Sequence, residues 1–313
     1  MGINEIEEWL RRTDNGSLWI SEEACKLINL AQELIANERT IVKNEIRIVI
    51  PGIELWTKTG DTVNALSTKI NDTYCVFVNK GVLENLREYY RTLNYDTFTL
   101  EEKELYVEKL VKYSWLFIVF HEYAHILCGH TEASLDDMKD KCAQEYEADM
   151  FAMDYLIGWV IRESGDLYMD ELEDLYIAVY LLIGRMQKDR WQDFYDDKRI
   201  QSYYDPDCIG QRDHPLSAQR LLYLFSMFSM FTFDGKMTPL PIKKEILGKL
   251  IKLKNIREDS FEKISDNNFG IVENSIRELQ KQVEEIRIKI PRRGSYNESE
   301  QKVRTEIKER FLY

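Results

Sequence analysis

The spacing of apolar residues along the chain predicts helices first, then strands, then helices to the end. Apolar positions recur at helical intervals over residues 3–12 and 21–37. Residues 45–50 alternate and end at a proline, and residues 73–78 are rich in β-branched and aromatic side chains, so both segments are typical of strands. The helical period then returns over residues 100–128, 139–162, 168–189, 215–231 and 241–256. Strands early and helices late favour an α+β fold.

Near the C-terminus, residues 272–290 carry apolar residues at alternating intervals of three and four, and Pro291 ends the pattern. This seam is shorter than the roughly three to four heptads that a coiled coil needs. Two interpretations stay open. The helix packs on its own domain, or it serves self-association or a partner.

Charge and cysteine content narrow the class of protein. The net charge of −13 argues against non-specific binding to nucleic acid or to anionic lipid, although residues 241–313 are mildly basic. Five cysteines with no CxxC pair suggest neither a disulfide framework nor a thiolate zinc site, which favours the cytoplasm. No apolar run approaches the roughly 20 residues of a membrane span, so we expect no transmembrane segment.

The motif that points to chemistry is His121-Glu122-Tyr123-Ala124-His125, which directly follows the apolar run 115–120. Residues four apart on a helix project to the same side, so His121 and His125 can bind one Zn²⁺ ion through their imidazole nitrogens. Glu122 lies beside that ion and can accept a proton from its bound water. This is the general-base arrangement of a metallopeptidase.

A second pair of residues follows on the next predicted helix. Glu145 and Asp149 are also four apart, and we predict Glu145 as the third zinc ligand, which leaves a fourth position for water. Asp149 can accept a hydrogen bond from the distal nitrogen of His121 and fix its tautomer. His130 would lie nearly opposite the ligands on a straight helix, so we interpret it as a supporting residue.

Taken in order, these motifs resemble those of the zinc endopeptidases of the CAAX prenyl protease and HtpX heat-shock protease family. The resemblance covers about residues 60–225 and implies that zinc is bound by His121, His125 and Glu145 and that Glu122 is catalytic. The similar positions are His121 to His125 with His130, Glu145-x-x-Ala148-Asp149, His214-Pro215 with Arg220, and Asn64-Ala65 followed by the β-rich run before Gly81.

The same resemblance implies further roles. His214 would stabilise the tetrahedral oxyanion, and Arg220 would orient groups near it. Asn64 and an edge strand containing Val76 and Val78 would bind an extended substrate through main-chain hydrogen bonds. From the residues alone, His214 before a proline is typical of a helix start.

The chain departs from that family in two respects, since it lacks a spanning segment and carries an acidic insertion at 84–112. In outline it also resembles the Lit-type phage-exclusion peptidases. We predict a zincin-like α+β fold with a small sheet, an edge strand packed on the active-site helix and a mostly helical C-terminal half. Its parts would be N-terminal helices at 1–40, a metallopeptidase domain at 41–235 and a charged helical appendage at 236–313.

The predicted function is that of a soluble, cytoplasmic zinc endopeptidase with one Zn²⁺ per chain, acting on a protein or peptide and not on nucleic acid. Zinc would lower the pKa of its bound water, and Glu122 would remove the proton and pass it to the leaving amine. The alternative is a catalytically silent or effector-gated zincin-fold interaction protein in phage or stress response. In the gated form, residues 84–112 or 241–313 would cover the cleft.

Overall fold

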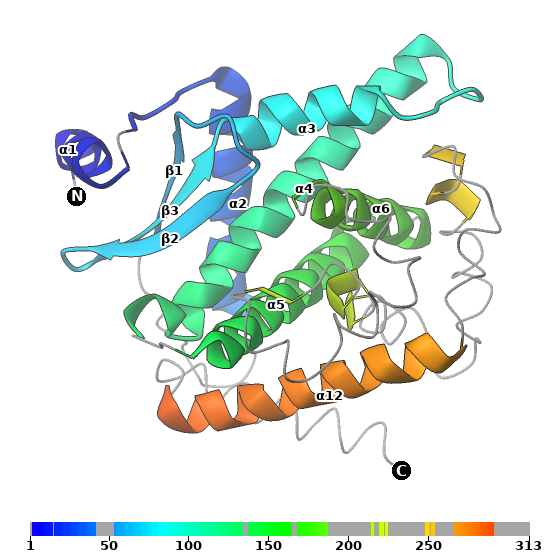
Figure 1. Ribbon diagram of the computed structural model, residues 1–313. Coiled ribbons are helices and arrows are strands. Elements are labelled where there is room, and N and C mark those ends of the chain that lie inside the picture. Colours follow the sequence, from blue (N-terminus) through cyan, green and yellow to red (C-terminus); the bar gives the residue numbers. More distant parts are fainter. Residues whose placement is uncertain are drawn as a thin grey trace.

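The computed structural model has the α+β fold that the sequence predicts, with a small sheet beside a layer of helices (Figure 1). Several predicted elements lie outside the residues that the structure describes, namely the strand at 45–50 and most of the helices at 215–231 and 241–256. The described residues are 2–14, 16–41, 53–133, 137–164, 168–186, 214–215, 219–221, 223–224, 248–250, 252–253 and 266–290.

The sheet has three strands in the order β1-β3-β2, comprising β1 (Ile53–Lys58), β2 (Ala65–Ile70) and β3 (Thr73–Asn79). β3 runs parallel to β1 and antiparallel to β2, to which a tight turn at Asn71 connects it. The strand predicted at 73–78 therefore exists, but it lies in the middle of the sheet and not at its edge. The two edges of the sheet are formed by β1 and β2.

Both faces of β3 are covered, which explains its almost continuous apolar sequence. One set of its side chains, including Val76 and Val78, joins the main hydrophobic core. The other set, including Phe77, faces helix α1 (Ile3–Thr13), where the ring of Trp9 stacks on Phe77 with 5.3 Å between centroids.

Helix α4 (Leu100–Leu127) is the centre of the helical layer. It begins with a reciprocal cap, in which the Thr99 hydroxyl accepts from the Glu102 backbone and the Glu102 carboxylate accepts from the Thr99 backbone. All residues from 115 to 120 are buried, because neighbours cover the helix on every side. These neighbours are the sheet, α2 (Glu22–Ile41), α3 (Gly81–Arg91), α5 (Met138–Ser164) and α6 (Tyr168–Met186).

The end of α4 determines where His130 lies. Gly129 adopts a left-handed conformation with φ of 78°, which glycine reaches without the penalty that a Cβ would bring. The chain turns back there and continues as the short 3₁₀ helix η1 (His130–Glu132). His130 consequently lies beside His125 instead of on the far side of a continued helix.

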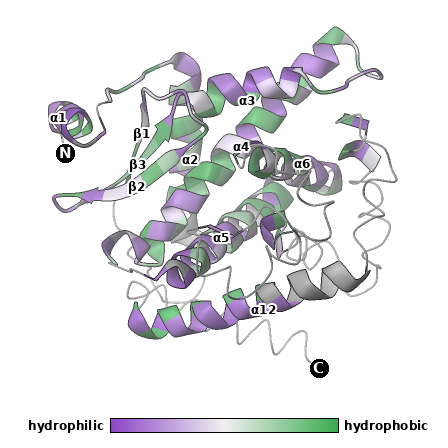
Figure 2. Ribbon diagram, in the orientation of Figure 1, coloured by the Kyte–Doolittle hydropathy of each residue, from purple (hydrophilic) through white to green (hydrophobic). Residues whose placement is uncertain are grey.

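Helix α12 (Asp266–Lys289) lies along α5 on the side of the molecule away from α3 (Figure 1). It is mostly hydrophilic with apolar positions interspersed (Figure 2), and the apolar ones Ile276, Leu279, Val283 and Ile286 are buried in the main core. The seam therefore packs on its own chain, as the first of the two interpretations has it. The domain limits at 40 and 235 stay predictions.

Candidate active site

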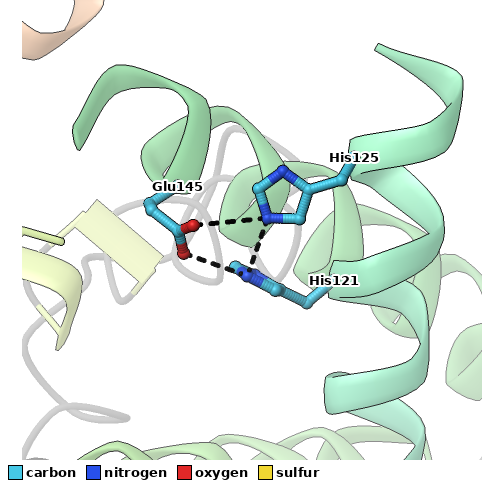
Figure 3. Close-up of side chains that lie close together, drawn as sticks. All are labelled: His121, His125 and Glu145. Carbon is cyan, nitrogen blue, oxygen red and sulfur yellow. Dashed lines mark hydrogen bonds and ion pairs between the residues drawn. The ribbon is translucent and has the colours of Figure 1, made fainter. Parts of the chain in front are cut away.

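Helix α4 presents His121 and His125 one turn apart, on the same side of the helix. Their Nε2 atoms lie 3.2 Å from each other. Helix α5 faces them and supplies Glu145, whose Oε2 lies 3.1 Å from His121 Nε2 and whose Oε1 lies 3.4 Å from His125 Nε2 (Figure 3). The three side chains point toward one centre from two helices.

This arrangement fits a zinc ion. Ligand atoms that bind zinc tetrahedrally at its usual bond lengths lie about 3.3 Å from one another, close to the distances between these three side chains. Two imidazoles and one carboxylate are the ligand set of several hydrolytic zinc enzymes. Glu145 Oε2 is also buried and receives no hydrogen bond of good geometry from the described residues, so it retains lone pairs for a metal.

The pKa values of His121 and Glu145 are shifted by the ionisable groups close to them. Burial alone lowers the pKa of His121, but the adjoining carboxylates of Asp149 and Glu145 outweigh it and raise the pKa to about 10. Burial likewise raises the pKa of Glu145, but the histidines around it bring the net pKa well below its usual range. The site thus holds Glu145 as a carboxylate, the form that binds a cation.

The distal side of His121 is held by a buried carboxylate. Asp149 Oδ1 lies 2.9 Å from His121 Nδ1, in the position expected of a residue that fixes the tautomer. Arg220 binds both oxygens of Asp149, at 2.7 and 2.6 Å, and Tyr223 donates a further hydrogen bond. Arg220 and Asp149 are both buried, so the arginine compensates a charge that would otherwise be costly.

Glu122 extends from α4 toward the strand β2. Burial raises the pKa of its carboxyl, and this effect outweighs the opposing influence of His121 and of the nearby Ser67. A carboxylate with a raised pKa binds and releases a proton nearer to neutral pH, which suits a general base. Glu122 and Ser67 thus line the same cavity from α4 and from β2.

These groups surround one cavity of about 360 Å³ between the two helices and β2. His214 lies at its exposed side, with its side chain 48% exposed and its Nε2 3.4 Å from Glu145 Oε2. The structure thus brings most of the predicted site residues together. The cavity lining includes Asn64, His121, Glu122, His125, Glu145, His214 and Arg220.

The predicted substrate-pairing residues Val76 and Val78 do not belong to this group. They are 1% and 0% exposed and lie on the central strand β3, whose backbone pairs with strands on both sides. The prediction of an edge strand at this position was wrong. A strand that is buried on both faces has an almost continuously apolar sequence. This pattern predicts a strand but does not give its position in the sheet.

The wall of the cavity is formed instead by β2. The backbone N–H of Asn79 donates to the Asn64 carbonyl at 3.0 Å, which fixes the pattern of the β2–β3 ladder. Because pairing alternates along an antiparallel strand, Ala65 and Ser67 direct their backbone groups away from β3. Among the described residues, no strand pairs with that side of β2.

Sequence reasoning missed Ser67, which lines the cavity, and Tyr223, which hydrogen-bonds Asp149. It also missed Glu147, a buried residue of α5 whose Oε2 lies 3.0 Å from His130 Nε2. Glu147 lies between Glu145 and Asp149 in the sequence, and a third acid within a helix that packs on its neighbours was a signal that could have found it. Neither residues 84–112 nor the described part of 241–313 contributes to the cavity lining, so the structure gives no support to either segment as a cover.

Comparison with known proteins adds one finding. Residues 78–193 match the family model described as Peptidase U49. The match indicates a peptidase. It runs from the end of β3 past α6 and includes the two helices that carry His121, His125 and Glu145. No curated protein and no solved structure gives a significant match. The closer resemblance to the CAAX prenyl protease and HtpX family stays a prediction, and no described helix is long and apolar enough to cross a membrane.

Proposed function

We propose that this protein is a zinc-dependent endopeptidase that hydrolyses peptide bonds of a protein substrate. The observation that carries the proposal is the convergence of His121, His125 and Glu145 within 3.1–3.4 Å of one another. The peptidase match over 78–193 supports the same reaction class. A cytoplasmic location agrees with the described cysteines, which are free thiols.

These three side chains would hold the ion, and each other residue has a task of its own. A bound zinc ion would polarise the substrate carbonyl and lower the pKa of a water molecule toward neutrality. Glu122, whose buried carboxyl has a raised pKa, accepts the proton of the attacking water and returns it to the leaving amine. His214, which lies 3.4 Å from Glu145 on the exposed side of the cavity, would donate a hydrogen bond to the developing oxyanion.

Arg220 takes a different part from the one that the family resemblance implies. Its guanidinium is engaged by both oxygens of Asp149 and is 3% exposed. We therefore assign Arg220 to holding Asp149 against His121, and not to contact with the substrate.

The substrate would lie along the open side of β2. Ala65 directs backbone groups toward that side, and Asn64, Leu66 and Ser67 also line the cavity. An extended peptide that adds to this edge gains main-chain hydrogen bonds that do not depend on its sequence. Specificity would then come from its side chains in the cavity.

The decisive experiment compares the wild type with Glu122→Gln and His125→Ala. We expect Glu122→Gln to keep its zinc and to lose about 10²–10⁴-fold in kcat, because only the proton transfer is removed. His125→Ala should lose both zinc and activity. Metal analysis measures the zinc content of each variant. New N-termini in a treated cell lysate measure its peptidase activity.

Discrete N-termini that appear with the wild type and not with Glu122→Gln would support the proposal and identify the substrate. Full turnover by a zinc-loaded Glu122→Gln variant would disprove the role of Glu122. A wild type that binds no zinc would disprove the metal site.

A further inference from the structure

The second zinc ligand, His125, is the start of a buried chain of hydrogen bonds that leads away from the cavity. Its Nε2 faces His121 and Glu145, while its Nδ1 lies 3.0 Å from His130 Nδ1. The other ring nitrogen of His130, Nε2, lies 3.0 Å from Glu147 Oε2. Arg287 of helix α12 donates to Glu147 Oε1 at 3.0 Å.

The direction of every hydrogen bond in this chain follows from the first one. When His125 uses the Nε2 lone pair as a ligand, its hydrogen is on Nδ1, so His125 donates and His130 Nδ1 must accept. The hydrogen of His130 is then on Nε2 and is donated to the Glu147 carboxylate. Only one tautomer of each ring satisfies the chain.

The two proposed zinc ligands on α4 thus have similar surroundings. A carboxylate oxygen of Asp149, which Arg220 compensates, lies 2.9 Å from His121 Nδ1. The carboxylate of Glu147, which Arg287 compensates, reaches His125 through one intervening imidazole. A carboxylate that orients a metal-bound imidazole raises its basicity and fixes its ring. Here the carboxylate of Glu147 acts on His125 through the imidazole of His130, which lies between them.

The burial of the chain strengthens this interpretation. His130 is 7% exposed and Glu147 is 5% exposed, so a carboxylate and an imidazole are withdrawn from water together. Such groups are stable only when they are hydrogen-bonded or paired. The left-handed turn at Gly129 and the contact of α12 with α5 place the two partners that satisfy Glu147.

We propose that His130, Glu147 and Arg287 are positioning residues that hold His125 in its Nδ1-protonated tautomer, and that helix α12 thereby supports the metal centre from behind. This inference rests on the proposed zinc site. It makes the C-terminal helix a structural part of that site.

A second metal ion in the same place is the rival explanation, since Cys128, His130 and Glu147 have ligand atoms within 4.8 Å of one another. Two observations disfavour it. Both ring nitrogens of His130 already have partners, and the Arg287 guanidinium next to Glu147 repels a cation.

The test measures zinc affinity of the full-length chain by competition with a chelator. We expect Glu147→Gln and His130→Ala to weaken zinc binding about 10–100-fold, and Arg287→Ala about tenfold. The matched control is Lys289→Ala, two residues further along α12, which removes an ion pair to Asp140 on the same helix α5. Its zinc affinity should stay within about twofold of the wild type.

A spectroscopic readout separates positioning from mere stability. The chain has only four histidines, so their side-chain ¹H–¹⁵N signals are readily assigned. The zinc-loaded wild type should show a protected His125 Nδ1–H signal, and His130→Ala should lose that protection. Thermal unfolding of the metal-free proteins checks that the isosteric variant Glu147→Gln is folded.

Zinc affinity within twofold of the wild type in both Glu147→Gln and Arg287→Ala would overturn the inference and leave the proposed function intact. Two zinc ions per wild-type chain, with the second abolished by Cys128→Ser, would overturn it in favour of a second metal site. A wild type without zinc affinity would overturn this inference together with the proposed function.

Discussion

At the scale of single residues, the most demanding feature is the buried ion pair of Arg220 with Asp149. Both groups are almost without contact to water, and the pair also carries a hydrogen bond from Tyr223. Removing one member of such a pair leaves the other charge buried without compensation.

We predict that Arg220→Ala lowers the free energy of unfolding by about 3–5 kcal/mol. Urea unfolding followed by circular dichroism measures this change. Arg162→Ala serves as the control, because Arg162 is exposed near the end of α5, the helix that carries Asp149. This substitution should change the free energy of unfolding by at most about 0.5 kcal/mol. Equal stabilities of the two variants would contradict the assigned role of Arg220.

The residues proposed to bind the metal could be predicted because their geometry is local. His121 and His125 share a helix face at a spacing of four, and so do Glu145 and Asp149, whatever the rest of the chain does. The partners Ser67, Tyr223 and Arg287 could not be predicted in this way. They meet the site through contacts between distant segments, and no local pattern encodes those contacts.

At the scale of elements, the close approach of α3 to the loop before β2 depends on Gly81. A Cβ at this position would lie 2.4 Å from the Asp61 carbonyl oxygen and 2.8 Å from that of Thr62. Both are backbone atoms, so a larger residue cannot be accommodated by rotation of a side chain.

Gly81→Ala should therefore lower the free energy of unfolding by about 1–3 kcal/mol. Gly158→Ala is the informative counterpart, because a Cβ there meets only the flexible end of Arg162 at 3.4 Å within helix α5. We expect it to raise stability by about 0.5–1 kcal/mol. Thermal or urea unfolding of the two variants should thus give opposite signs, and a shared sign would refute the explanation.

The order of the strands shows the limit of prediction at this scale. The sequence indicates a strand at 73–78 correctly, and its apolar character agrees with burial on both faces. The prediction that this strand lies at the edge failed because β2, with a mixed polar pattern, pairs beside it. Which strand lies outermost is decided by pairing, and pairing is a property of the whole sheet.

At the scale of the whole molecule, α12 contributes to the main hydrophobic core. It contributes four buried apolar side chains, each of which stabilises the fold by about 1.5–3 kcal/mol. The hypothesis that residues 241–313 gate the cleft leads to a different expectation, namely that truncation releases activity.

We predict that a chain ending at residue 265 is strongly destabilised and gains no peptidase activity. A chain ending at residue 290 keeps α12 and separates the loss of this helix from the loss of the segment after it. Urea midpoints and peptide hydrolysis by all three proteins provide the comparison. Higher activity of the chain ending at 265 would restore the gating hypothesis.

The cysteines report on the fold as a whole. Burial, with a smaller contribution from Glu54, raises the pKa of the Cys75 thiol to about 12, while Cys25 is exposed. In the unfolded chain a thiol ionises near about 8.5. The contribution of the neutral Cys75 thiol to stability is thus fully present below that pH and is lost as the pH rises toward 12.

At pH 8, iodoacetamide should label Cys25 quickly and Cys75 only after unfolding, as measured by mass spectrometry. The free energy of unfolding should fall between about pH 8.5 and 12, and less steeply in Cys75→Ala. Rapid labelling of Cys75 in the folded protein would contradict its burial.

The distance in sequence between the supporting carboxylates Asp149 and Glu147 and the arginines that compensate them has a consequence for biosynthesis. Arg220 lies 71 positions after Asp149, and Arg287 lies 140 positions after Glu147. At ordinary rates of translation the second interval lasts on the order of 10 s. A nascent chain therefore exposes the proposed zinc ligands well before both carboxylates have their cations, and a fully supported centre forms only after residue 287 has been synthesised.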